Sequence, residues 1–455
     1  MESILAIALP VALVWGAVVF CRGGLLGGCL AVLFTGCCFG YAWFRLPTEP
    51  VPVTLDRLLW LALLVQYIVW RRWGLANPKP LGKADFAILA FFAVLLVSTL
   101  AHDWRQHGAA PVARLLFFWM MPLAVYWIAR QSVATERSVL AVFACMAVFG
   151  VYLAVTALAE TRQLQGLIFP RYIASAEYPD FLGRARGPLL NPIGNGMYQV
   201  VGLVCLFLWW PRLSRPGQLL LLGLAAVMCA GIASTMTRSV WMGAAAALLV
   251  LAGVTVPRVW RFPALGCVLL FGAALLGSQW ERLLAFKRDR DLDARAAAES
   301  VELRPVLATV AWKMFLDRPL LGCGFGQYLV ASADYVSDRS THLVLEKARP
   351  YVQHNTLLAL LTETGAAGAG LFLVVLTLWS QGAWQLWQSR AAPLWARQAG
   401  LLFVAVAANY VINGMFHDVS IIAMVNMLLF FLAGLSAGVQ STASASAIEQ
   451  LPQST

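Results

Sequence analysis

Long apolar stretches separated by short polar ones run along almost the whole sequence. A helix needs roughly twenty residues to cross about 30 Å of hydrocarbon, and about twelve to thirteen stretches approach that length. They show no alternation of polar and apolar positions, so helices are predicted, because backbone amides inside a bilayer have no water partner. The pattern therefore predicts an all-α polytopic membrane protein with one multi-spanning domain over residues 1–440. The segments lie near residues 2–20, 24–45, 57–71, 85–101, 114–130, 138–159, 192–211, 217–234, 239–256, 263–280, 355–380, 398–416 and 420–440.

Lysine and arginine are unevenly spread over the loops between these segments. One alternate set of loops holds most of them and is predicted to be cytoplasmic, because cytoplasmic loops of membrane proteins are rich in these residues. The opposite set is predicted to face outward and includes two long loops, near 160–191 and 281–354. Within the second loop, residues 306–329 have the pattern of an amphipathic helix on or near the membrane, closed by a proline and a glycine turn. The Ser/Ala/Thr-rich end, 441–455, is predicted to be a disordered cytoplasmic tail.

The composition agrees with a membrane protein, since 60% of the 455 residues are hydrophobic and only 12% are charged. The net charge of +11 is accounted for by the loop pattern and by contact with anionic lipid, so no nucleic-acid partner is predicted. Cys323 is the only cysteine in an outward loop. A disulfide framework outside the cytoplasm is therefore not expected.

Polar residues concentrate at four places in the outward loops. The first is the stretch FLGRARGPLLNPIGNGMYQ, in which Arg184 and Arg186 precede a turn and Asn191 begins a helix. An arginine presents a fork of donors that matches phosphate, and a helix N-terminus adds backbone amides, so this stretch is a candidate anion site. The alternative is that the two arginines are anchors reaching toward lipid headgroups.

The second and third places each contribute one arginine. Arg238 lies in a tight outward turn between two apolar helices, where it needs an anionic partner or access to water. A structural ion pair is the alternative for this residue. Arg304 lies in the long outward loop, ahead of the glycine turn Gly322-x-Gly324-x-Gly326. No strand precedes these glycines, so they do not indicate dinucleotide binding.

The fourth place is RPYVQHNTLLALLTETG, where a polar loop passes into an apolar run. His354 lies at the foot of the predicted helix, and a neutral imidazole there could accept a proton from a hydroxyl group. The alternative is a histidine that caps the helix or lines a polar pocket. Glu363 follows Asn355 in the same helix and lies about 13 Å from His354. It is therefore expected to orient an arginine rather than to act as the base.

Several kinds of chemistry have no counterpart in this sequence. It contains no HExxH pair, no paired cysteine ligands, no Walker loop and no Gly-x-Ser-x-Gly elbow. The five histidines show no metal-ligand spacing, so neither a metal nor a cofactor is predicted. Arginines would have to neutralise any phosphate themselves.

The order and spacing of these motifs resemble those of the O-antigen ligase and polymerase superfamily of bacterial envelope glycosyltransferases. The family pattern Arg-x-x-Gly, then Asn-Pro, is similar to the stretch from Arg184 to Pro192, although a second Asn directly after the proline is missing. The remaining matches are a Ser/Thr-Arg turn at Thr237, Arg238 and Ser239; an Arg, Trp and Asp-x-Pro-Leu-x-Gly-x-Gly series at Arg304, Trp312, Asp317, Pro319, Leu320, Gly322 and Gly324; and His-Asn followed by Glu-x-Gly at His354, Asn355, Glu363 and Gly365.

The resemblance implies an O-antigen ligase-like enzyme of lipopolysaccharide biosynthesis in the bacterial inner membrane, with its active face in the periplasm. Such an enzyme transfers a glycan from an undecaprenyl diphosphate carrier to lipid A-core or a related glycolipid or glycan, without a metal and with inversion. Carried over to this chain, it makes His354 the base and places Arg184 and Arg238 on the leaving diphosphate. Arg186, Asn191, Arg304, Asn355 and Glu363 become candidate substrate-binding residues.

Two other functions remain open at this stage. A polysaccharide polymerase of the same superfamily would carry the same motifs, with another carrier-linked glycan as its acceptor. A transporter of lipid-linked sugars should show inverted repeats and polar residues at the bilayer midplane. The polar residues gather instead at one membrane face, which favours an enzyme.

Overall fold

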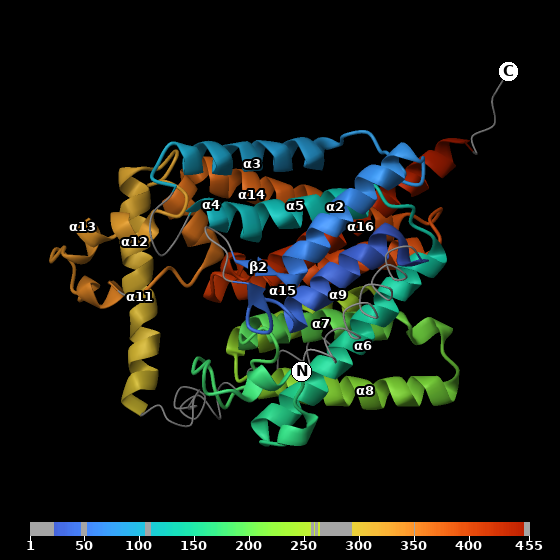
Figure 1. Cartoon of the computed structure of the whole chain (residues 1–455), viewed down its shortest axis with the longest axis horizontal. Helices are drawn as coiled ribbons and strands as arrows, with labels where there is room; N and C mark the ends of the chain where they lie inside the picture. Colours follow the sequence, from blue (N-terminus) through green and yellow to red (C-terminus); the bar gives the residue numbers. More distant parts are fainter. Residues whose placement is uncertain are drawn as a thin grey trace.

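The computed structural model describes residues 22–46, 52–104, 111–255, 259, 263, 294–349 and 351–449. Nine helices in this part of the chain are long and apolar enough to cross a membrane. The prediction of an all-α polytopic membrane protein is confirmed. The apolar segment 2–20 and all but the first residue of 263–280 lie outside the described residues. The potential membrane-spanning helices run side by side in a bundle (Figure 1).

The helices follow the apolar segments of the sequence closely. The nine potential spans are α3 (Lys83–Leu100), the continuous run of α4 (Pro111–Arg114), a π-helical turn (Leu115–Met120) and α5 (Met121–Arg130), then α6 (Glu136–Thr161), α7 (Pro192–Leu208), α8 (Arg215–Ser234), α9 (Arg238–Thr255), α14 (Thr356–Gln388), α15 (Leu394–Phe416) and α16 (Ala423–Glu449). Two further predicted segments also form helices, Arg22–Cys38 and α2 (Leu55–Arg72).

The predicted boundary between the last helix and a disordered tail needs correction. Helix α16 continues past residue 440 to Glu449, so residues 441–449 are helical. The buried part of α16 supplies the costly nucleus, and the alanines that follow extend a helix readily. Residues 450–455 lie outside the described part of the chain, and the side of the membrane on which this end lies remains a prediction.

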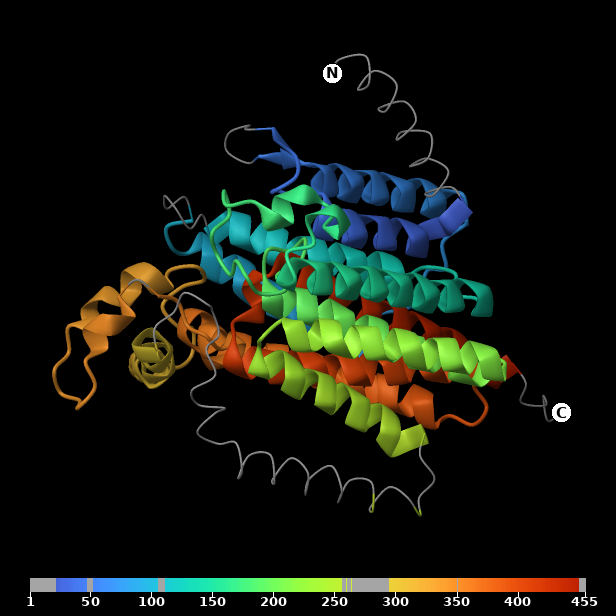
Figure 2. The ribbon, with the colours of Figure 1, turned by 90° about the horizontal axis from the view of Figure 1, so that it is seen from below.

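The predicted outward loops gather at one end of the bundle, at the left in Figure 2. Two short strands, β1 (Arg45–Leu46) and β2 (Val53–Thr54), pair antiparallel just before α2. The loop 160–191 contains two 3-10 turns, Gln165–Leu167 and Arg171–Ala174. At the other end, Arg130 forms a buried ion pair with Asp85 at 2.8 Å. The predicted outward loops thus share one end of the bundle, and the side of the membrane that this end faces stays a prediction.

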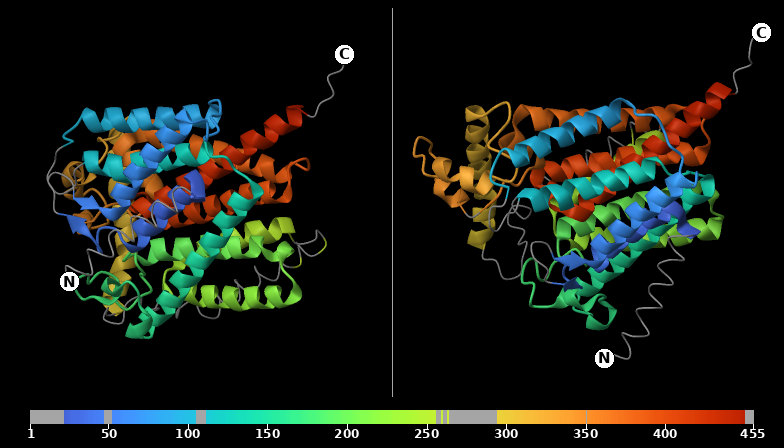
Figure 3. Two further views of the ribbon diagram at one scale, coloured as in Figure 1. Left: turned by 45° about the vertical axis from the view of Figure 1, so that its right-hand side comes forward. Right: turned by 45° about the horizontal axis from the view of Figure 1, so that its top comes forward.

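The long second loop builds a small module at that end. Helix α11 (Ala294–Asp317) lies across the ends of the bundle helices (Figure 1; Figure 3, right), and α12 (Tyr328–Ala331), α13 (Ala333–Val336) and a 3-10 turn (Leu345–Ala348) pack beside it. The helix ends before Pro319 as predicted, but it already includes Ala294, because the charged stretch 294–305 is rich in helix-forming residues. The module has its own apolar core, formed by Val306, Leu307, Val310, Met314, Cys323, Tyr328, Val336, Leu345 and Ala348.

A break in α14 holds this module to the bundle. Gly365 has φ +63° and ψ −164°, which interrupts the helical hydrogen bonds and leaves backbone groups without helical partners. The segment after α11 supplies the missing partners. The amide of Cys323 donates to the carbonyl of Thr362 at 2.8 Å, and the amide of Ala366 donates to the carbonyl of Pro319 at 2.8 Å. Irregular backbone at membrane depth is tolerated only where protein satisfies it, and this docking does so.

Candidate functional site

Arg184 is buried and holds the turn that precedes α9. Its guanidinium donates to the carbonyl of Thr235 from Nε at 3.2 Å and to the hydroxyl of Thr237 from Nη2 at 2.5 Å. The side chain of Arg184 therefore fixes the backbone that leads directly into Arg238, the first residue of α9. In the structure the two predicted catalytic arginines are thus neighbours joined through this turn.

Two further predicted residues, Arg304 and His354, lie at the outward end of α15, and helix α9 adjoins it. Gly243 of α9 lies against Asn409 and Asn413 of α15, so the start of α9 adjoins the end of α15. The Arg304 guanidinium lies 5.9 Å from the centre of the Phe416 ring at that end.

His354 is exposed, and its ring centre lies 6.4 Å from that of His417, the residue that follows α15. Arg304 and His354 therefore meet at residues 416–417 from two parts of the chain, and α9, which begins at Arg238, adjoins the same end of α15.

Two predicted asparagines are helix caps in this region. Asn191 accepts hydrogen bonds from the amides of Ile193 and Gly194, with Pro192 at the first position of α7. Asn355 accepts from the amide of Leu358 and donates to the carbonyl of Met415 at 2.9 Å. Capping satisfies amides that the helix leaves free. Asn355 additionally fixes the foot of α14, and with it His354, against the end of α15.

Arg186 has a different environment from the one predicted. Its side chain is fully buried, and all five of its N–H groups donate to backbone carbonyls of the loop 160–191: those of Ile173, Ser175, Tyr178 and Asp180. The carboxylate of Glu160 lies 3.6 Å from Nε. Since its donors are used inside the loop, Arg186 organises the loop, and its contact with substrate stays a prediction.

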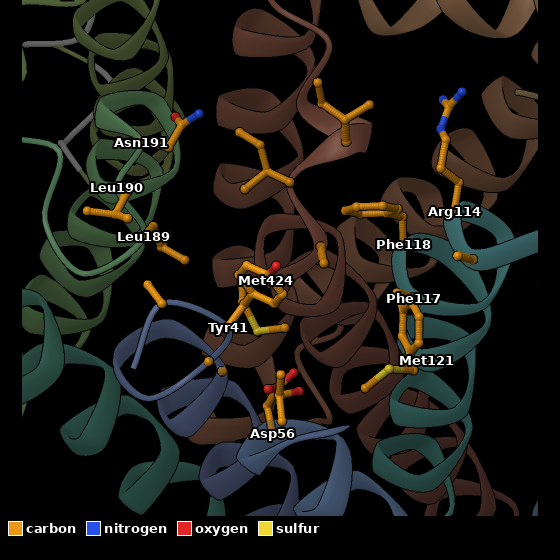
Figure 4. Close-up of a pocket in the computed structure, with 18 of the residues that line it drawn as sticks. Tyr41, Asp56, Arg114, Phe117, Phe118, Met121, Leu189, Leu190, Asn191 and Met424 are labelled. Carbon is orange, nitrogen blue, oxygen red and sulfur yellow. The ribbon is translucent and has the colours of Figure 1, made fainter. Parts of the chain in front are cut away.

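A cavity of about 1070 Å³ adjoins this cluster, since Gln353 and Asp418, the chain neighbours of His354 and His417, line it. Figure 4 shows part of its wall. Asn191 and Glu363 line it, whereas the other predicted site residues are not among its lining. Neighbouring positions in the chain face the two regions: Gln353 and Asp418 line the cavity, while His354 and His417 face each other. The cavity wall also contains aromatic and apolar side chains, among them Tyr41, Phe117, Phe118 and Met121, which precede the motifs, and Leu189, which lies within the first one.

The charged groups of the cavity include an ion pair that contains Glu363. Its Oε1 lies 2.9 Å from Nη1 of Arg114, and the Glu363 side chain is only 4% exposed. Glu363 therefore orients an arginine, as its distance from His354 suggested. The pKa of the nearby Asp418 carboxyl is raised by its burial. Arg114 comes just before the π-helical turn, a feature often found at functional sites.

Arg114 and His417 are site residues that the motifs missed. Arg114 is the first residue of an apolar segment, and His417 follows another in the stretch FHDVS. Neither residue belongs to a recognisable motif. Their positions could still have marked them as candidates. Ionisable residues at the ends of apolar segments on the outward side are uncommon and usually pair with another polar group. Only the fold reveals that those partners are Glu363 and His354.

Residues 223–373 match the family model described as O-Antigen ligase, about one third of the chain. This range contains Arg238, Arg304, His354 and Glu363. The match supports the O-antigen ligase superfamily. The family implies a membrane enzyme of the O-antigen ligase and polymerase type, acting broadly as a glycosyltransferase on lipid-linked glycans. No curated protein matches the chain.

Replacing Glu363 by glutamine should destabilise the protein by about 2–3 kcal/mol, because it leaves the Arg114 charge without its carboxylate in a mostly buried place. The matched control is Glu346→Gln, since the Glu346–Arg349 pair has the same 2.9 Å separation but is more than half exposed. The control should change stability by less than about 0.5 kcal/mol. Thermal unfolding of both variants in detergent makes the comparison, and equal shifts would contradict the structural importance of the buried pair.

Proposed function

We propose that this protein is a membrane glycosyltransferase of the O-antigen ligase type. It transfers a glycan from an undecaprenyl diphosphate carrier to lipid A-core or a related acceptor at the periplasmic face of the bacterial inner membrane. The observation that carries the proposal is the meeting of Arg304 and His354 at the end of α15, with the helix that Arg238 begins packed against that end and a large cavity beside it. The family match adds the reaction class.

Each residue of the cluster has a distinct task in the proposed reaction. His354 is exposed and accepts the proton from the acceptor hydroxyl, with His417 next to it. Arg238 and Arg304 neutralise the negative charge that grows on the leaving diphosphate. Arg184 acts through the turn at 235–237, which its hydrogen bonds hold in place for Arg238. Attack from the side opposite the diphosphate inverts the anomeric centre, and no metal takes part.

Substituting His354 by alanine should lower the rate of transfer by about 100-fold, the contribution expected of a general base. The measurement uses purified protein in detergent and chelator, a labelled undecaprenyl-diphosphate glycan, and assays with and without lipid A-core. His342→Ala is the matched control, because His342 is an exposed histidine of the same long loop. It should leave the rate unchanged.

The products of this assay also separate the two members of the superfamily. Product on lipid A-core that depends on His354 supports the ligase. Extension of the carrier-linked glycan alone would make the protein a polymerase instead. Full activity of His354→Ala would remove the proposed base, and loss of activity in chelator would contradict the metal-independent reaction.

A further inference from the structure

Two buried polar groups without partners lie at one end of the cavity. Thr54 is 1% exposed and Asp56 is 8% exposed, and both line the cavity. The hydroxyl oxygen of Thr54 and Oδ1 of Asp56 have no hydrogen-bond partner. In Figure 4 the Asp56 side chain stands at the bottom of the view, pointing up into the space, while Arg114 and Asn191 lie at the top. The strand β2 and the helix α2, which supply these two groups, carry none of the family motifs.

The local fold explains why these groups are free. Thr54 pairs with Arg45 in the two-stranded sheet and occupies the N-cap position of α2, where a threonine hydroxyl would normally accept a bond from the first turn. Here no side-chain capping bond forms. Asp56 is the second residue of α2, two residues after Thr54 and within the first turn of the helix. The sheet and the helix start thus present both groups to the cavity.

Leaving such groups buried and unpaired is costly, which makes a missing ligand the natural explanation. A carboxylate accepts hydrogen bonds strongly and repels phosphate, so it suits neutral groups that carry O–H or N–H donors. The neighbouring guanidinium of Arg57 lies 3.6 Å from the centre of the Phe117 ring and donates to the carbonyl of Pro52, and its charge disfavours a cation beside Asp56.

Aromatic rings complete the surroundings. Tyr41, Tyr172 and Tyr178 line the same cavity, together with Phe117. Flat aromatic faces pack against the apolar C–H faces of sugar rings, while a carboxylate and a hydroxyl bind the ring hydroxyls. This combination of donors, acceptors and faces matches a carbohydrate better than a lipid chain or a phosphate group.

We propose that Thr54 and Asp56 form a subsite that binds hydroxyl groups of a sugar residue in the substrate. The subsite and Arg114 lie at opposite ends of the cavity in Figure 4. This inference rests on the proposed function, since it names a contact that the glycan makes. The sugar belongs either to the carrier-linked donor or to the acceptor, because both present the same hydroxyl chemistry.

Equilibrium binding to the full-length protein in nanodiscs tests the subsite. The three probes are a fluorescent undecaprenyl-diphosphate glycan, undecaprenyl diphosphate without sugar, and the core oligosaccharide of the acceptor. Asp56→Ala should weaken one of the two sugar-bearing probes by about 10-fold, the effect of losing a hydrogen bond to a charged group, and should leave the sugar-free carrier unchanged. Weakening of the donor glycan assigns the subsite to the donor, and weakening of the core oligosaccharide assigns it to the acceptor.

Two further variants keep the result interpretable. Thr54→Val has nearly the same shape and should weaken the same probe, whereas Asp334→Ala, at an exposed position of α13, should affect none. Removal of an unpaired carboxylate should not lower the thermal stability of the ligand-free protein, so Asp56→Asn should melt at or above the wild-type temperature. Unchanged binding of both sugar-bearing probes, or equal weakening of the sugar-free carrier, would overturn the subsite.

Failure of the subsite and failure of the proposed function give different results. If the wild type transfers no glycan but binds a sugar-bearing probe in a manner that depends on Asp56, the subsite stands and the transferase assignment falls. If transfer proceeds and requires His354 while the Asp56 variants bind every probe normally, the reverse holds.

Discussion

Replacing Gly365 by alanine should lower the free energy of unfolding by about 4 kcal/mol or more, combining backbone strain with a steric clash. The residue has φ +63° and ψ −164°, a conformation in which side chains other than that of glycine are strained. A Cβ atom there would stand 2.3 Å from the backbone of Leu320, which cannot move without breaking the docking of the module. Because the docked segment also bonds Glu363, whose carbonyl accepts from the amide of Gly324 at 3.0 Å, transfer activity should fall as well.

Gly370→Ala is the control within the same helix. A Cβ at Gly370 meets nothing within 4 Å, and alanine favours helix, so this variant should be as stable as the wild type or slightly more so. Thermal unfolding in detergent measures both variants, and limited proteolysis reports whether residues 318–326 have left α14. A Gly365→Ala protein that melts with the wild type would show that the break in α14 can be closed without cost.

The three glycines discounted as a nucleotide motif acquire a physical role through this docking. Gly322, Gly324 and Gly326 all have positive φ, and a Cβ at each would collide with a different neighbour: the backbone of Glu363, the ring of His102 and Pro111 respectively. The chain thus passes through a narrow space between α3, α4 and α14. Glycine is required at these positions so that the backbone itself can approach the bundle closely.

The sequence predicted the helices well because lipid imposes the strongest constraint in such a protein. Length and apolarity of a segment nearly determine a transmembrane helix, so the segments 192–211 and 398–416 closely match α7 and α15. The motifs also identified residues that meet in space, such as Arg304 and His354 at Phe416 and His417. Hydropathy therefore predicted the helix bundle, and the order of the motifs predicted the position of the candidate cluster.

The tasks of individual side chains were harder to predict, and the arginines show why. Arg184 and Arg186 both donate to backbone carbonyls, and every residue type offers the same carbonyl, so no sequence pattern marks such partners. The Arg114–Glu363 pair joins positions 249 residues apart, a separation that only the folded chain brings together. The extension of α16 beyond residue 440 was also hard to predict, because the polar residues 441–449 are helical only as a continuation of the buried part of the same helix.

Substitution of Arg186 by methionine should destabilise the protein by about 5 kcal/mol, because it strands a buried carboxylate and several buried carbonyls at once. Methionine fills a similar volume but has no donor. Glu160 would then keep its backbone hydrogen bond from the amide of Gly187 but lose the guanidinium beside it, and the carbonyl of Ile173, which now accepts two bonds from the guanidinium, would lose both. The loop 160–191 should lose its fixed shape and become sensitive to protease.

Arg171→Met is the matched control, since Arg171 is an exposed arginine of the same loop and its loss should change stability by less than about 0.5 kcal/mol. Arg186→Lys should fall between the two, because an ammonium keeps the charge near Glu160 but offers three donors where the guanidinium uses five. The melting temperature without substrate is the decisive measurement, since a residue that only binds substrate would not alter it. An Arg186→Met protein that melts like the wild type yet binds the carrier weakly would contradict this prediction. It would show that Arg186 binds substrate and that other contacts hold the loop 160–191 in shape.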